Sequence, residues 1–79
     1  MSPTILIIGS YRFFFYSGDR NEPPHVHVER DKNTAKIWLT PIRLQSNKGF
    51  RPAEIQDILR IIENHQEKLL EHWHEYFSD

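Results

Sequence analysis

The last third of the chain carries apolar residues at helical spacing, and this pattern constrains the fold more than any other feature of the sequence. Pro52 suits the first position of a helix, where the N–H group that proline lacks would have no partner. The stripe lapses at residues 64–66, so the sequence allows one long helix or two helices with a break near Asn64. We favour the broken form, because a helix of about 25 residues would span roughly 37 Å, which is long for a small sheet. The apolar positions of this helical region, residues 52–77, follow the i, i+3, i+4, i+7 rule: Ile55, Ile58, Leu59, Ile62, Leu69, Leu70, Trp73 and Phe77.

The residues before the helical region have the composition and the alternation of β-strands. Short turn-forming stretches separate the strand-like runs, and two hairpins are the simplest arrangement. We therefore predict an α+β fold, in which a small antiparallel sheet of about four strands, within residues 4–44, is covered on one face by the C-terminal helix or broken helix. Residues 46–49 are predicted to form a loop. The predicted strands are residues 4–8, 11–16, 25–29 and 34–40.

A length of 79 residues without a cysteine limits the chain to one small domain that its own core must stabilise. Neither a disulfide framework nor a thiolate metal cage is available. The longest aliphatic run, residues 5–8, is far shorter than the roughly 20 residues that a membrane-spanning helix needs. The N-terminal residues also lack the basic and apolar regions of a secretory signal. We therefore expect a single domain over residues 1–79, located in the cytoplasm and without a membrane segment.

Charge is divided unevenly along the chain, although the net charge is only −1. Residues 1–51 contain eight basic and four acidic residues, a net charge of +4. Residues 52–79 contain two basic and seven acidic residues, a net charge of −5. Such a dipolar chain indicates a charged partner or the packing of one half against the other. The first half mixes basic with aromatic residues, as nucleic-acid-binding sheets do, but an isoelectric point of about 6.5 disfavours nucleic acid as the partner.

Alternation along the third and fourth predicted strands assigns their side chains to two faces of the sheet. The apolar side chains at positions 26, 28, 37 and 39 share one face, and we expect the helical region to cover it. The opposite face then carries aromatic and histidine side chains. An exposed sheet face of this kind usually contacts a partner molecule. The commonest partner for such a face is a second copy of the chain. The residues assigned to this open face are His25, His27, Glu29, Lys36 and Trp38.

The Pro-Pro-His-Val-His-Val run, residues 23–28, contains the strongest candidate for a chemical site. His25 and His27 lie two residues apart on one strand, so their Cα atoms are roughly 6.5–7 Å apart and both rings point to one face. Two imidazoles at this spacing could bind one zinc ion, with Glu29 as a third ligand on the same face. They could also act as the acid and base of a hydrolytic reaction, because histidine titrates near pH 6.5. The alternative is that both are structural residues that hydrogen-bond or pack on Trp38.

The helical region adds acidic and histidine residues. Glutamates at four-residue intervals from residue 63 to residue 75 form either a solvated outer face or an acidic stripe that docks on a basic partner. His72 and His74 lie about 200° apart on a helix and do not face each other, although either could supply a third metal ligand. The candidate partner-binding residues are Tyr16, Lys36 and Trp38 on the sheet, and Glu63, Glu67 and Glu71 on the helix.

Residues 11–17, the Pro-Pro-His-Val-His-Val run, residues 35–39, residues 49–50 and the aromatic C-terminus together resemble an uncharacterised bacterial family known as domain of unknown function 4160. The most specific motif of that family is a Pro-Pro-His-x-His-Val block, whose histidines correspond to His25 and His27. The resemblance covers nearly the whole chain. It implies a cytoplasmic bacterial or archaeal protein, often encoded beside another small protein in a pair that looks like a toxin–antitoxin module. It implies no established activity.

Two functions from different classes remain in view. The first is a partner-binding module, one half of a toxin–antitoxin-like pair, that requires no cofactor and binds a small protein encoded nearby or a second copy of itself. The second is a small nuclease or hydrolase, in which His25 and His27 are the acid and base or ligands of a metal such as zinc. The sequence contains no P-loop, nucleotide-binding glycine pattern, Ser-His-Asp order or zincin motif, which excludes NTPases, flavoproteins and cysteine hydrolases.

Overall fold

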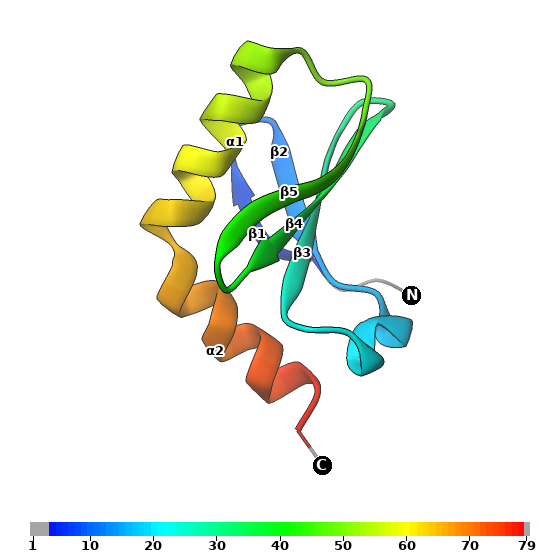
Figure 1. The fold of residues 1–79 in the computed structure, drawn as a ribbon, viewed down its shortest axis with the longest axis vertical. Helices are drawn as coiled ribbons and strands as arrows, with labels where there is room; N and C mark the ends of the chain where they lie inside the picture. The colour runs from blue at the N-terminus through cyan, green and yellow to red at the C-terminus, as the bar shows by residue number, and fades with distance from the viewer. Residues whose placement is uncertain (1–3, 79) are drawn as a thin grey trace.

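The computed structural model describes residues 4–78 as an antiparallel sheet with two helices packed on one face (Figure 1). Consecutive strands are neighbours throughout, so the sheet is a five-stranded antiparallel meander. The predicted α+β class is confirmed, with five strands in place of about four. The strands are β1 Thr4–Ile8, β2 Tyr11–Phe14, β3 His25–Arg30, β4 Asn33–Leu39 and β5 Ile42–Lys48.

The strand that the sequence pattern did not reveal is β5. We predicted a loop over residues 46–49, but residues 46–48 continue β5, and Pro41 lies in the turn that joins β5 to β4. β5 is an edge strand, and all of its side chains after Ile42 are exposed. A strand that buries almost nothing has no need to alternate apolar with polar residues, so the period-two pattern is missing.

The helical region is broken, as favoured from its sequence, into α1 Pro52–Asn64 and α2 Gln66–Tyr76. The polar residues that interrupt the apolar stripe satisfy backbone groups at the break. The Nδ1–H group of His65 donates to the carbonyl oxygen of Ile61 at 2.8 Å, and Gln66 Nε2 donates to the carbonyl of Leu39 at the end of β4 at 2.7 Å. Within residues 4–78, neither helix combines the length and the apolar character that crossing a membrane requires.

The core lies between the helices and one face of the sheet, which we call the covered face. Val26, Val28, Ile37 and Leu39 have no exposed surface, as predicted from their alternation. Complete burial of an aliphatic side chain is worth about 1.5–3 kcal/mol, so this face supplies most of the stability of so small a domain. The helices contribute the other half of the core: Ile55, Ile58, Ile62, Leu69 and Trp73.

The other face of the sheet, which we call the open face, is arranged in rows that cross the strands. The register aligns His25 with Trp38 and Trp38 with Arg43, so these three side chains form one row from β3 to the edge strand β5. His27 lies between Phe14 and Lys36 in the next row. The short 3₁₀ helix η1, Ser17–Asn21, lies beside this face and close to the end of α2, where Arg20 of η1 donates to the carbonyl oxygen of Phe77 at 3.2 Å (Figure 1).

Candidate functional site

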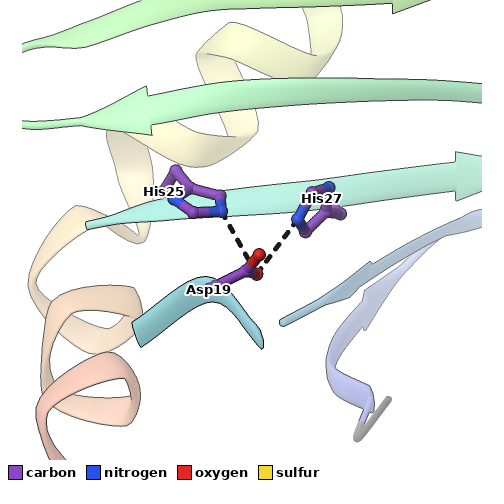
Figure 2. Close-up of side chains that lie close together, drawn as sticks. All are labelled: Asp19, His25 and His27. Atoms are coloured by element: carbon purple, nitrogen blue, oxygen red, sulfur yellow. Dashed lines mark hydrogen bonds and ion pairs between the residues drawn. The ribbon is translucent and has the colours of Figure 1, made fainter. Parts of the chain in front are cut away.

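The strand β3 and the helix η1 bring three chemically active side chains together at one end of the open face (Figure 2). Asp19 Oδ2 lies 3.1 Å from His25 Nε2 and 3.0 Å from His27 Nε2. One ligand atom from each residue falls within 4.8 Å of the other two. We refer to this group as the Asp19–His25–His27 cluster.

The backbone of η1 holds the carboxylate of Asp19 in place. The N–H group of Tyr16 donates to Asp19 Oδ2 at 2.9 Å, and the N–H group of Asp19 donates back to the carbonyl oxygen of Tyr16 at 3.0 Å. A carboxylate at the third position of a helix satisfies the N–H group that precedes the first turn in the same way. This pair of bonds aims the carboxylate of a loop residue at the sheet.

Two prolines carry the chain from η1 into β3, and their carbonyl groups position the site. Proline has no N–H group, so Pro23 and Pro24 add no unpaired donors where the chain re-enters the fold. The carbonyl of Pro24 accepts the N–H group of Leu39 at 3.0 Å, which joins the proline run to the end of β4. The carbonyl of Pro23 lies 2.9 Å from His25 Nδ1.

His25 has no exposed surface and is the most constrained member of the cluster. Its ring lies between Trp38 and Trp73, with centroid distances of 5.5 Å and 5.1 Å. Because a carbonyl oxygen only accepts, Nδ1 must carry a hydrogen and donate it to Pro23. In the neutral ring the lone pair is then on Nε2, which faces the Asp19 carboxylate.

His25 Nε2 finds no hydrogen-bond partner among the described residues, although Asp19 Oδ2 is only 3.1 Å away. The contact has the length of a hydrogen bond but not its geometry. A buried polar atom without a partner costs about 1–3 kcal/mol. A cation between the nitrogen and the carboxylate would satisfy both.

His27 is partly accessible, with 15% of its side chain exposed. It stacks on Phe14, with ring centroids 5.5 Å apart, and Tyr16 meets its ring in an edge contact at 4.6 Å. Burial lowers the pKa of His27 below the usual 6.5, and the nearby Asp19 carboxylate opposes that shift. His27 Nε2 donates to Asp19 Oδ2 at 3.0 Å, so a metal ion bound at this nitrogen would take the place of that hydrogen.

The spacing of the cluster suits a metal ion. Ligand atoms about 2.1 Å from an ion lie roughly 3.0–3.4 Å from one another in octahedral and tetrahedral geometry. The two distances from Asp19 Oδ2, 3.0 and 3.1 Å, are at the lower end of that range. The bond from His25 Nδ1 to a backbone carbonyl is also the usual way in which a metal-binding histidine has its ring orientation fixed.

The other candidate ligands from the sequence do not join the cluster. Glu29 shares the face of the two histidines, but its carboxylate pairs with Arg12 at 3.0 Å. His72 and His74 lie on α2 and are not part of this group. Sequence reasoning missed Asp19, which lies six residues before His25 in a loop that has no strand or helix period to place it.

The candidate partner-binding residues fall into two sets. Tyr16 is half exposed beside His27, and Lys36 forms a 2.5 Å ion pair with Glu22 while its Nζ atom lies 5.0 Å from the centre of the Trp38 ring. The second set is on the helices, which pack against the covered face, and the break at residue 65 interrupts the glutamate ladder. Its members, all exposed, are Glu63, Glu67 and Glu71.

Comparisons with known proteins agree with the resemblance noted in the sequence. The searches of curated proteins and of solved structures returned no match. A family model described as a domain of unknown function matches residues 10–74. The matched residues include the whole Asp19–His25–His27 cluster, strands β2 to β5 and α1. The chain belongs to the DUF4160 family, as its Pro-Pro-His-Val-His-Val run predicted.

Proposed function

We propose that this protein is a metal-dependent hydrolase, in which the Asp19–His25–His27 cluster binds one divalent transition-metal ion. The observation that carries the proposal is the orientation of His25. One ring nitrogen donates to the carbonyl of Pro23, and the other is buried without a hydrogen bond opposite a carboxylate. A bound ion gives that nitrogen, His27 Nε2 and the carboxylate oxygen a common partner.

A set of three protein ligands favours a catalytic over a purely structural ion. Structural zinc sites are usually closed by four protein ligands, whereas catalytic sites leave a position for water or substrate. The side chains of Asp19 and His27 are 10% and 15% exposed, so the cluster is not sealed from solvent. When bound there, the ion would supply a water of lowered pKa at neutral pH.

The charges around the cluster favour an anionic substrate such as a phosphoester. Arg12, Lys36 and Arg43 share the open face with the two histidines; Arg12 and Lys36 are each paired with a glutamate, whereas Arg43 has no acidic partner among residues 4–78. Hydrolysis would add water to phosphorus and break the ester P–O bond, with the proton transferred to the departing oxygen. Phosphoester hydrolysis is the chemistry that a metal centre beside basic side chains serves best.

Burial argues against His25 and His27 as a metal-free acid–base pair. An acid or base must come within hydrogen-bond reach of the substrate. His25 has no exposed surface and lies between two tryptophans, so a substrate cannot reach its ring without displacing them. The ligand role requires only that the metal, not the substrate, contacts His25.

Zinc binding by purified protein that carries no histidine tag tests the proposal. We expect one zinc ion per chain by elemental analysis, and at least about a tenfold loss of affinity by calorimetry in Asp19→Asn and His27→Gln. Asp19→Asn keeps an oxygen that can accept the Tyr16 N–H group, so η1 should persist. Glu29→Gln and His74→Gln are matched controls outside the cluster and should bind as the wild type does.

Cleavage of bis(4-nitrophenyl) phosphate by the zinc- and manganese-loaded protein tests the hydrolytic step. The rate should fall to background in His27→Gln and remain in His74→Gln. A wild-type protein that takes up no stoichiometric metal would overturn the metal site. A protein that binds metal but hydrolyses no phosphoester would overturn the reaction class.

The exposed edge of the sheet favours a second candidate, the partner-binding half of a toxin–antitoxin-like pair. β5 is seven residues long, lies at the edge of the sheet and exposes Leu44. A free strand edge of this kind accepts a strand from another protein through main-chain hydrogen bonds. Co-expression with the protein encoded beside it, followed by size-exclusion chromatography, should give a stable complex. Gln45→Pro should abolish that complex if β5 is the contact, and monomers of both proteins in the mixture would rule the pairing out.

A further inference from the structure

A cleft beside the Asp19–His25–His27 cluster opens on the row of side chains that leads to the sheet edge. Trp38 is its aromatic wall, Arg43 its charged wall, and three prolines provide rigid apolar surface. Two of its lining residues contact His25 directly, because Pro23 accepts its Nδ1–H bond and the Trp38 ring is 5.5 Å from the imidazole. The lining residues are Pro23, Pro24, Trp38, Thr40, Pro41 and Arg43.

We propose that this cleft is the substrate subsite of the hydrolytic centre and binds a nucleotide, with the planar base against Trp38 and the phosphate near Arg43 and Lys36. This inference rests on the proposed function where it concerns the reaction of the bound nucleotide. The chemical class of the bound molecule is inferred from the cleft alone. Bases of single-stranded nucleic acids bind proteins by stacking on aromatic side chains beside cations, and Trp38 with its neighbouring Lys36 and Arg43 offers the same pair of contacts to a single nucleotide.

The charges that surround the cleft support an anionic occupant. Arg43 is exposed and has no acidic partner among residues 4–78, so its guanidinium is available to a phosphate. Lys36 is held by Glu22, whose carboxylate is exposed and whose pKa is lowered, chiefly by the hydrogen bond from Lys36. An exposed ion pair of this kind is worth little, so a phosphate can replace the carboxylate at small cost.

Side chains on the open face of the sheet connect the cleft to the Asp19–His25–His27 cluster. His25, Trp38 and Arg43 form one cross-strand row, and Lys36 is the neighbour of His27 in the next row. The Nζ atom of Lys36 lies 5.0 Å from the centre of the Trp38 ring. The cation beside Trp38 therefore belongs to the cross-strand neighbour of His27, and we place the phosphate of a nucleotide whose base is in the cleft beside this cation.

Titration of ¹⁵N-labelled protein with three probes separates ring from phosphate recognition. Adenosine 5′-monophosphate carries both groups, adenosine carries only the ring, and ribose 5-phosphate carries only the phosphate. We expect the monophosphate to bind at least about fivefold tighter than either of the others, with shifts at Trp38, Thr40 and Arg43. No binding of the monophosphate up to about 10 mM, or affinity equal to that of ribose 5-phosphate, would overturn the subsite.

Two substitutions test the walls of the cleft, and a third controls for overall charge. Trp38→Leu and Arg43→Gln should each weaken the monophosphate about fivefold or more. Lys48→Gln removes the same charge from the same strand, opposite Thr34 and away from the cleft, and should change affinity less than about twofold. Equal losses in Arg43→Gln and Lys48→Gln would indicate attraction to charge alone and overturn the proposal. Arg43→Gln is an exposed substitution, so the test remains available if Trp38→Leu does not fold.

Zinc content measured on the same samples keeps the two proposals apart. Arg43→Gln should retain zinc at the wild-type ratio while it loses nucleotide affinity. A wild-type protein that binds the monophosphate but no zinc would overturn the metal centre and leave the cleft as a nucleotide site. A protein that binds zinc but not the monophosphate would overturn the subsite alone.

Discussion

The two faces of the sheet are built from the same strands but by different physical rules. The covered face is a continuous apolar layer under α1 and α2, in which Val26, Val28 and Ile37 have no exposed surface. On the open face, some charged side chains form individual ion pairs, as Arg12 does with Glu29, whereas the buried His25 Nε2 has no hydrogen-bond partner among the described residues. The difference teaches that this small domain is stabilised mainly on one side of its sheet and carries the side chains of its candidate site on the other.

The largest effect should come from deleting a side chain of the covered face. Ile62→Ala removes a fully buried side chain of α1 and should lower the free energy of unfolding by about 2–5 kcal/mol, because a cavity remains where the side chain was. Urea denaturation followed by circular dichroism measures this. Leu44→Ala removes atoms from a side chain that is 37% exposed on β5 and should cost less than about 1 kcal/mol. Leu44 is paired with Ile37, so similar losses in both variants would mean that the core extends to the exposed edge strand.

Zinc bound at the open face should stabilise the folded protein by an amount set by its affinity for the Asp19–His25–His27 cluster. At a free zinc concentration 100 times the dissociation constant, the free energy of unfolding should rise by about 2.7 kcal/mol, since only the folded chain brings Asp19 to the two histidines. Urea denaturation with and without zinc measures the gain. Asp19→Asn should lose most of it, whereas Glu29→Gln should keep it, because Glu29 pairs with Arg12 outside the cluster. A gain that persists in Asp19→Asn would place the ion elsewhere.

A substitution of Gly49 tests the connection between β5, at the edge of the sheet, and α1, which packs on the covered face. Its φ of 101° lies in the region that side chains rarely adopt, and an added Cβ atom would lie 2.1 Å from Asn33 Oδ1. Gly49→Ala should therefore cost about 1–3 kcal/mol of unfolding free energy, measured by urea denaturation. Gly18→Ala is the control, since a Cβ atom at Gly18 in η1 meets nothing within 4 Å. Equal stability of the two variants would show that the Asn33 side chain moves aside and that the backbone at residue 49 tolerates a Cβ atom.

The covered face could be predicted from sequence because burial imposes a period. The alternation of β3 and β4, the apolar stripe of the helices and the break near Asn64 all follow from which side chains must avoid water. β5 was not predicted, because the side chains of an exposed edge strand do not have to avoid water. The strength of the signal in each element follows how much of that element is buried.

The candidate site could be predicted only in part, because its residues meet through loop geometry. His25 and His27 were identified from their spacing on one strand, but Asp19 reaches them through a hydrogen bond from the Tyr16 backbone that no period encodes. The burial of His25 was missed for a related reason. Trp38 and Trp73 enclose it from β4 and α2, elements distant in sequence, so a residue assigned to an open face has no exposed surface.

The smallest effect we predict concerns His27, which is partly buried and partly in contact with solvent. In metal-free protein, burial lowers its pKa below the value near 6.5 of the unfolded chain, because desolvation disfavours the charged ring more than Asp19 favours it. Between the two pKa values the unfolded chain binds more protons than the folded one. The contribution of His27 to the free energy of unfolding is therefore greatest above about pH 6.5 and declines as the pH falls through the folded-state pKa. An NMR titration of the His27 ring, with its signal assigned by comparison with His27→Gln, measures the shift; a pKa at or above 6.5 would mean that the Asp19 charge outweighs burial.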